Sequence, residues 1–232
     1  QLDMVWEEKE ANRKKVRKMV QEASGQGVEL LVFPEMTLTG FSMEVEKTWE
    51  EKGETVSFFK ELSKEFQICI GFGYVKRANN RGRNQFCVVK DGEVLVEYTK
   101  IHPFSYGKES LYFEAGNEIT GFNLKNFHRG MFICYDLRFP EVFQISARKN
   151  EVILLIADWP KARVEHFRAL LKARAIENQC YIVGVNRVGK GNGLDYVESS
   201  MAFDPLGERL TKAHSKAELQ VVEMHAGMVK EI

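Results

Sequence analysis

The sequence lacks the features that mark membrane, secreted and metal-dependent proteins. No apolar run approaches the roughly 20 residues that a membrane span needs, and residues 1–8 show no basic segment followed by an apolar one. The four cysteines and five histidines have no paired short spacing, which argues against a zinc site and against a small disulfide scaffold. Gly71 and Gly73 lack the third glycine of a dinucleotide-binding turn. We therefore expect a cytoplasmic protein with free thiols and with neither a metal nor an organic cofactor.

An excess of charge of either sign is also missing. Lysine and arginine together number 33, as do aspartate and glutamate, so no net charge attracts nucleic acid or an anionic membrane surface. The partner that we predict is instead a small-molecule substrate. A chain of 232 residues, 44% of them hydrophobic, is long enough for one large globular domain. Because no repeat, linker or low-complexity segment interrupts it, we assign residues 1–232 to a single domain.

Hydrophobic patterns alternate between helix and strand along the chain. Helical spacing of apolar residues predicts helices at about 7–24, 55–66, 139–148 and 163–178. Short apolar runs predict strands at about 28–33, 68–75, 85–90, 93–98, 130–134, 152–157, 180–187, 199–203 and 208–210. Asp91-Gly92 is typical of a hairpin turn, and residues 101–117 have the composition of a long functional loop. The alternation after residue 130 indicates a layered α/β fold.

Three chemically different side chains come directly after predicted strands. Glu35 follows the apolar run at 28–33, Lys100 follows the hairpin, and Cys134 closes the strand at 130–134. Open α/β sheets bind ligands outside the carboxyl ends of their strands. An acid, an amine and a thiol placed in this way can meet in one site. From their positions after strands alone, however, the simpler expectation is that the three side chains are solvated or packed separately and do not form a site.

The surroundings of these residues favour the site. Glu35 follows five nonpolar residues, so its carboxyl group is expected to be partly desolvated, which suits a general base. Cys134 is followed at once by polar and charged residues, whereas the other cysteines lie in or beside apolar runs. Its place between a strand and a helix start is like the turn that presents a hydrolase nucleophile above its sheet. For Lys100, an amine that extends to the surface is the simpler interpretation.

Three sequence blocks resemble the signature blocks of the nitrilase superfamily of carbon-nitrogen hydrolases. They are Phe33-Pro34-Glu35, the segment Tyr98-Thr-Lys100-Ile-His102, and Cys134-Tyr-Asp-Leu-Arg-Phe-Pro-Glu141, in the order of the family. Further matches at 109–116, 173–179 and 186–189 extend the resemblance over nearly the whole chain. It implies an α/β fold, the nitrilase-like αββα sandwich of two sheets flanked by helices. It also implies a homodimer of four layers that pairs through the helices at 139–148 and 163–178, and a first strand of which Gln1 is about the last residue.

The same resemblance assigns the chemistry. Cys134 is implied as the nucleophile, Glu35 as the general base and Lys100 as the cation of the transition state. Glu109 matches the second glutamate of the family, which is usually credited with holding the lysine. The backbone N–H of Tyr135 is expected to be a second donor to the oxyanion. This scheme needs no metal and no organic cofactor.

Finer similarities concern the substrate. Asp158-Trp159-Pro160 and the later segment 185–189 are similar to the omega-amidase branch, which hydrolyses the side-chain amide of 2-oxo acids such as 2-oxoglutaramate and 2-oxosuccinamate. The same triad could instead hydrolyse an N-carbamoyl amide, deaminated glutathione or a nitrile, and these alternatives stay open. A non-catalytic dimeric scaffold is the alternative from another class, against which the intact triad argues.

Aromatic residues are predicted to line the substrate pocket. Trp159 and Tyr106 are suggested because aromatic rings with polar edges suit the walls of small cavities. Phe41 is a third predicted pocket residue. Packing at the base of a loop is an equal alternative for Trp159 and Tyr106. Asp136 and Arg138 are interpreted as an ion-pair network that fixes the turn at Cys134, in preference to partners of the substrate or the thiol.

Overall fold

The computed structural model describes residues 1–50, 52–212 and 218–230. None of the helices in these ranges is long and apolar enough to cross a membrane. The elements follow one another in this order: α1 (Lys9–Gly25), β1 (Leu30–Val32), α2 (Val45–Thr48), α3 (Glu54–Glu65), β2 (Cys69–Ala78), β3 (Arg81–Lys90), β4 (Glu93–Thr99), η1 (Ser105–Gly107), α4 (Glu109–Tyr112), β5 (Gly121–Leu124), β6 (Phe127–Ile133), η2 (Cys134–Arg138), α5 (Pro140–Ala147), β7 (Val152–Ala157), η3 (Lys161–Arg163), α6 (Val164–Asn178), β8 (Tyr181–Asn186), β9 (Gly189–Gly191), β10 (Leu194–Tyr196), β11 (Met201–Phe203) and η4 (Met228–Lys230).

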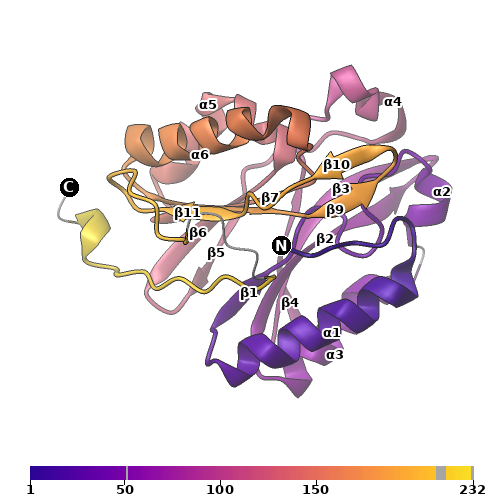
Figure 1. Cartoon of the computed structure of the whole chain (residues 1–232), viewed down its shortest axis with the longest axis horizontal. Helices are drawn as coiled ribbons and strands as arrows, with labels where there is room; N and C mark the ends of the chain where they lie inside the picture. Colours follow the sequence, from indigo (N-terminus) through magenta and orange to yellow (C-terminus); the bar gives the residue numbers. More distant parts are fainter. Residues whose placement is uncertain (51, 213–217, 231–232) are drawn as a thin grey trace.

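The first sheet contains β1 to β4 in the order of the sequence. β1 pairs with β2 in parallel, and the other neighbours are antiparallel. α1 and α3 cover its outer face (Figure 1), where Val16 of α1 and Phe59 of α3 are completely buried in one apolar cluster. The ring of Phe59 stacks on Phe72 of β2 with the centroids 3.9 Å apart. The apolar stripes predicted from the sequence therefore attach both helices to this sheet.

The second sheet contains five strands in the order β11-β8-β7-β6-β5. β6, β7 and β8 are parallel, and β5 and β11 pair antiparallel at the two edges. Every residue of the central strand β7 is buried, as expected for a parallel strand covered on both faces. α5 and α6 cover the outer face through Phe143 and Phe167, which are both completely buried (Figure 1).

The inner faces of the two sheets pack on each other. Phe86 and Tyr98 of the first sheet share one core cluster with Phe132 and Leu155 of the second. The rings of Tyr98 and Phe132 meet edge to face with their centroids 5.7 Å apart. The layers are therefore helices, sheet, sheet and helices (Figure 1), which confirms the predicted αββα sandwich.

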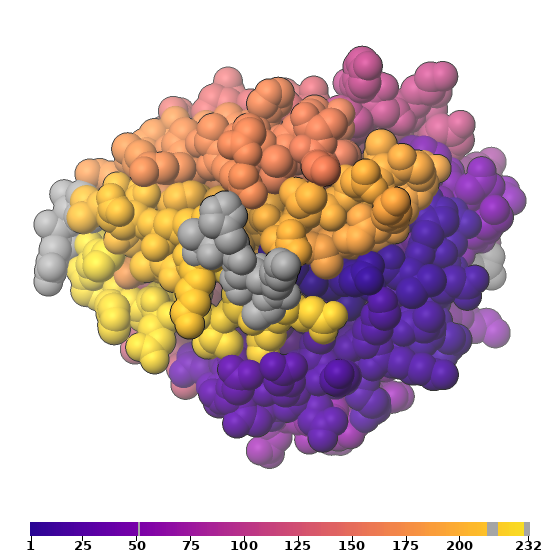
Figure 2. All heavy atoms as spheres, viewed as in Figure 1, coloured from indigo at the N-terminus to yellow at the C-terminus, as the bar shows by residue number. Residues whose placement is uncertain are grey.

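Residues 218–230, yellow in Figure 2, run across the face between the N-terminal helix layer and the α6 layer. The amino group of Gln1 donates a hydrogen bond to the carbonyl of Glu218 at 2.8 Å. The N–H of His225 donates to the hydroxyl of Tyr181 at 3.2 Å. The segment thus connects the start of the chain with β8.

The loops contain more regular structure than the pattern predicts. The segment 101–117 contains η1 and α4, the glycine-rich stretch forms the hairpin of β9 and β10, and the edge strand β5 has no predicted counterpart. The strand predicted at 208–210 is reduced, within the described residues, to a single antiparallel bridge, between Phe203 and Arg209, with the N–H of Leu210 donating to the carbonyl of Ala202 at 2.9 Å. In the turn before it, Asp204 Oδ1 accepts the N–H groups of Leu206 and Glu208.

Candidate active site

Glu35, Lys100 and Cys134 meet where β1, β4 and β6 end. Glu35 lies just beyond β1, and Lys100 and Cys134 come directly after β4 and β6. The Nζ of Lys100 lies 2.9 Å from Oε1 of Glu35. Both charges lie close enough to the Cys134 thiol to act on its pKa. The structure therefore brings the three residues together from two different sheets.

Cys134 occupies a strained turn. Its φ of +48° is a left-handed conformation that residues with a Cβ rarely adopt. The buried carboxylate of Asp136 holds this turn: Oδ2 accepts the N–H of Ile133 at 3.0 Å and the hydroxyl of Tyr98 at 2.7 Å. Oδ1 accepts the N–H of His102 at 2.9 Å. These bonds fix the sulfur relative to the end of β4.

The Glu35 carboxylate is completely buried and accepts hydrogen bonds at both oxygens. Oε1 accepts from Lys100 Nζ at 2.9 Å and from Asn84 Nδ2 at 2.7 Å, and Oε2 accepts the N–H of Asp158 at 2.9 Å. Gly73 of β2 permits this placement, because a Cβ there would lie 2.8 Å from the Cα of Glu35. The carboxylate is therefore held in a single position at the site.

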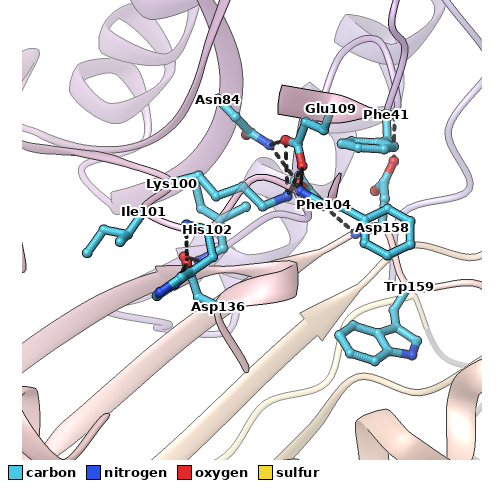
Figure 3. Close-up of polar contacts among 12 residues, drawn as sticks. Phe41, Asn84, Lys100, Ile101, His102, Phe104, Glu109, Asp136, Asp158 and Trp159 are labelled. Atoms are coloured by element: carbon cyan, nitrogen blue, oxygen red, sulfur yellow. Dashed lines mark hydrogen bonds and ion pairs between the residues drawn. The ribbon is translucent and has the colours of Figure 1, made fainter. Parts of the chain in front are cut away.

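Lys100 is a buried ammonium group between two carboxylates. Its Nζ lies 2.9 Å from Glu35 Oε1 and 3.0 Å from Glu109 Oε2, and Figure 3 shows it directed toward Glu109 and Asn84. Asn84 donates to both carboxylates, at 2.7 and 3.0 Å. Burial alone would lower the pKa of Lys100, but the charges of Glu109 and Glu35 outweigh it and hold that pKa well above its usual value. Lys100 therefore stays positively charged.

Burial raises the pKa of the Cys134 thiol well above its usual value. The negative charge of Glu35 raises this pKa further, against the opposing charge of Lys100. At neutral pH the sulfur is therefore a protonated thiol. Such a thiol needs a base when it attacks a carbonyl carbon, and Glu35 is placed to be that base.

A cavity of about 70 Å³ opens beside Cys134. Its wall contains Phe41 and Trp159, two of the three aromatic residues predicted to line a pocket. The Phe41 ring centroid lies 5.2 Å from Lys100 Nζ, and the indole N–H of Trp159 donates to a backbone carbonyl at 2.7 Å. The rest of the wall comprises Lys100, Phe104, Tyr135, Arg138, Asp158, Pro160, Arg163, Leu194 and Tyr196. Across the described residues, no three or more His, Cys, Asp or Glu side chains are grouped to hold a metal ion.

Tyr106 does not line this cavity, so that prediction is wrong. Its side chain is 86% exposed, because it lies in the middle of η1, where the loop turns it outward. Phe104 forms that part of the wall and packs edge to face on Tyr135 with the centroids 5.0 Å apart. Without a helical or strand period in the loop, the sequence does not distinguish two aromatic residues two positions apart.

Asp136 and Arg138 do not share the predicted ion-pair network, although Asp136 does fix the turn. Asp136 fixes the turn through the N–H and hydroxyl groups described above, and it also contacts the ring of His102 at 2.8 Å. Arg138 lies over the ring of Trp159 at 5.2 Å, with Nη2 3.2 Å from His166 Nδ1. Side chains two positions apart on a helical turn do not face each other, which explains the difference. Among the described residues, Arg138 has no carboxylate partner.

Three residues of the site are not predicted from the sequence. Asn84, which bridges the two carboxylates, lies within β3, where the alternating pattern gives no sign of a special role. Asp158 belongs to a segment noted for its family resemblance, but the segment does not indicate where the side chain points. Arg163 is the last residue of η3, directly before α6, and its guanidinium lies over Phe104 at 5.4 Å. In the part of the chain that the structure describes, it too lacks a carboxylate partner.

Comparison with known proteins decides the family. The family model described as carbon-nitrogen hydrolase matches residues 1–232. The chain belongs to the carbon-nitrogen hydrolase family. The resemblance of the three sequence blocks is thereby confirmed, and the protein is a carbon-nitrogen hydrolase that acts on amides.

Two relatives of this carbon-nitrogen hydrolase have named activities. Omega-amidase YafV of Escherichia coli (strain K12) is 32% identical over 92% of this chain and 82% of its own length. The 2-oxoglutaramate amidase of Bacillus subtilis (strain 168) is 33% identical over 91% of this chain and 83% of its own length.

Solved structures share the fold. XC1258 from Xanthomonas campestris, a CN-hydrolase superfamily protein with an arsenic adduct in its active site, has a TM-score of 0.87 at 28% identity. That match covers 100% of this chain and 90% of XC1258. An amidase from Nesterenkonia sp. has a TM-score of 0.89 at 20% identity, over 100% of this chain and 90% of its own.

Proposed function

We propose that this amidase hydrolyses the omega-amides of short 2-oxo acids, 2-oxoglutaramate and 2-oxosuccinamate, and releases ammonia. The observation that carries the proposal is a pair of guanidinium groups, those of Arg138 and Arg163, in the wall of the cavity that holds Cys134. Among the described residues neither has a carboxylate partner, and each is held over an aromatic ring. Two unpaired cations beside the nucleophile favour a substrate that carries a carboxylate at the end away from its amide.

The relatives and the size of the cavity support the same substrates. The relatives with named activities include an omega-amidase at 32% identity and a 2-oxoglutaramate amidase at 33%, and also a nitrilase of Pyrococcus abyssi at 30%. A cavity of about 70 Å³ suits a short linear chain better than a deaminated tripeptide. N-carbamoyl amides and nitriles would use the same triad and serve as the competing substrates in the test. The buried network around Lys100 argues against a non-catalytic scaffold, which has no need of a lysine between two buried carboxylates.

In the first half of the proposed reaction, the sulfur of Cys134 attacks the amide carbon while Glu35 accepts the thiol proton. The carbonyl oxygen becomes an oxyanion, which the Lys100 ammonium and the backbone N–H of Tyr135 stabilise, each by about 3 kcal/mol. Tyr135 lies in the first turn of η2, where N–H groups have no partner within the helix. Glu35 then gives its proton to the nitrogen, the carbon-nitrogen bond breaks, and a thioester with Cys134 remains.

In the second half, Glu35 takes a proton from a water molecule, which attacks the thioester carbon. The same carboxylate can act twice because it ends the first half ionised. Collapse of the second tetrahedral intermediate returns the proton to the sulfur and releases the acid. Glu109 and Asn84 position the lysine and Glu35 throughout, since both hold hydrogen bonds within this network.

Ammonia release from a substrate panel tests the proposal. We expect turnover of 2-oxoglutaramate and 2-oxosuccinamate, and we expect Arg138→Gln to raise KM about 10- to 100-fold, the cost of losing a hydrogen bond to a charged group. A neutral amide of equal length should respond little to this substitution. Lys161→Gln is the matched control, because it removes an exposed cation near Arg163 that does not line the cavity. Turnover of an N-carbamoyl amide or a nitrile without turnover of either 2-oxo acid amide would contradict the proposal.

We also propose a homodimer that pairs through α5 and α6. Ile145 of α5 and Ile176 of α6 are 52% and 49% exposed, and Leu206 is 61% exposed. Sedimentation at micromolar concentration is expected to show a dimer, and Ile176→Lys to shift it toward monomer because a charge would enter an apolar contact. A monomeric profile for the unaltered protein would exclude this assembly.

A cytoplasmic location stays a prediction. The four cysteines are free thiols, and three of them are buried. That state suits a reducing compartment.

A further inference from the structure

Asp158 has an oxygen without a partner in the wall of the cavity. The residue follows β7, and its side chain is completely buried. Its backbone N–H donates to Glu35 Oε2 at 2.9 Å, and its Oδ2 accepts the N–H of Phe41 at 2.7 Å (Figure 3). Within the described part of the chain, Oδ1 has no hydrogen-bond partner. A buried polar atom is rarely left unpaired, so Oδ1 is available to a molecule bound in the cavity.

The surroundings of Asp158 favour the neutral form of its carboxyl group. Burial raises the pKa of Asp158 to about 8, against the charge of Arg187 and assisted by that of Glu35. Oδ2 already accepts a hydrogen bond and lies 3.9 Å from Nη1 of Arg187, so the proton belongs on Oδ1. The titratable and charged groups that act on this network come from several elements: Glu35 beyond β1, Lys100 beyond β4, Cys134 in η2, Arg187 beyond β8 and Tyr196 in β10. With its proton on Oδ1, the carboxyl group presents an O–H donor in the cavity wall.

Asp158 is connected to both the reacting end and the cationic end of the cavity. On one side its N–H contacts Glu35, and on the other the ring of the next residue, Trp159, lies under the guanidinium of Arg138. A substrate with its amide at Cys134 and its carboxylate at Arg138 passes Asp158 with the atoms in between. In the omega-amide of a 2-oxo acid, the hydrogen-bond acceptor in that stretch is the 2-oxo oxygen.

We propose that Asp158 recognises the 2-oxo group of the substrate by donating a hydrogen bond from Oδ1 to the 2-oxo oxygen. The inference rests on the proposed function, and it names the residue that distinguishes a 2-oxo acid amide from a plain one. A buried carboxylic acid that stays protonated can donate a hydrogen bond to a substrate oxygen. The proposed hydrogen bond would also give Asp158 Oδ1 the partner that it lacks among the described residues.

The test compares two substrates that differ in the 2-oxo oxygen alone, 2-oxoglutaramate and glutaramate. The quantity measured is the ratio of their kcat/KM values. We expect Asp158→Ala to lower this ratio about tenfold, the effect of one lost hydrogen bond. Asp158→Asn should keep the ratio near the wild-type value, because its amide oxygen accepts the Phe41 N–H and its NH₂ group donates where the acid O–H did. A purely structural role would lower both kcat/KM values together and leave the ratio unchanged.

The pH dependence of this ratio of kcat/KM values is an independent test of the role of Asp158. In the wild type we expect the ratio to fall as pH rises through about 8, where Asp158 loses the proton that it donates. In Asp158→Asn the ratio should be independent of pH. Other titrating groups act on reaction steps that both substrates share. They change both kcat/KM values by the same factor, so their effect cancels in the ratio.

The outcomes separate this inference from the function on which it rests. If the wild type does not hydrolyse 2-oxoglutaramate, the proposed function is wrong. If it hydrolyses both substrates and Asp158→Ala leaves the ratio unchanged, the role of Asp158 is wrong and the function stands. A wild-type ratio that does not change between pH 6 and pH 9 likewise overturns the role of Asp158.

Discussion

Replacement of Cys134 by alanine is expected to abolish amide hydrolysis, lowering kcat by about 10⁵-fold or more, as happens when an enzyme loses its nucleophile. The geometry explains the size of the effect. Glu35 and Lys100 are buried and hydrogen-bonded to each other, so neither is free to act as a substitute nucleophile. Without the sulfur, the remaining groups can only orient the amide and polarise its carbonyl.

Cys180→Ala is the matched control. Cys180 is as free as Cys134 but is buried at the start of β8, outside the cavity wall. We expect this variant to keep its activity and to lose only the small packing contribution of one sulfur atom. Activity is measured as ammonia release, and folding by circular dichroism. If Cys134→Ala were folded and turned over substrate at a rate near that of Cys180→Ala, the thiol mechanism would be refuted.

Lys100→Met is expected to lose catalysis and also to destabilise the fold by about 3–5 kcal/mol, the cost of leaving buried charges without their partner. The ammonium lies within 2.9 and 3.0 Å of two carboxylates, and these side chains are at most 1% exposed. Removing the cation leaves two buried carboxylates, Glu35 and Glu109, without their common positive charge. The measurement is the free energy of unfolding from a urea titration.

Two comparisons show whether the buried charges are the cause. Lys100→Met combined with Glu109→Gln should recover part of the lost stability, because one of the two unpaired carboxylates is gone. Lys76→Met breaks an ion pair with Glu97 at 2.8 Å in which the side chains are 48% and 29% exposed, so it should cost about 1 kcal/mol or less. Equal losses for Lys100→Met and Lys76→Met would show that the buried network does not stabilise the protein as we describe.

The core of the site could be predicted because the sequence blocks around Glu35, Lys100 and Cys134 resemble the signature blocks of the family. Each of the three residues also follows a strand, but position alone favours three separate side chains. The apolar stripes of α1 and α3 and the buried run of β7 indicate how these elements are buried. These features depend on local spacing, which the sequence records directly.

Beyond Phe41 and Trp159, the wall of the cavity could not be predicted, because it depends on side-chain direction in segments without a period. Phe104 and not Tyr106 faces the cavity, owing to the single turn of η1. Arg138 and Arg163 meet the same cavity from η2 and η3, two short turns far apart in the chain. Burial raises the pKa of Asp158, and the charges that act on it, Arg187 against the rise and Glu35 with it, lie beyond other strands and are brought close by the packing of the two sheets.

The most direct test of the account is capture of a thioester on Cys134 during turnover. Wild-type enzyme reacting with 2-oxoglutaramate is quenched with acid, digested and analysed by mass spectrometry, and a parallel reaction contains hydroxylamine. We predict a Cys134 peptide that is heavier by the mass of the substrate less ammonia, and formation of the corresponding hydroxamate, which only an acyl-enzyme intermediate can give. An unmodified Cys134 peptide at every quench time, with no hydroxamate while ammonia accumulates, would contradict the mechanism.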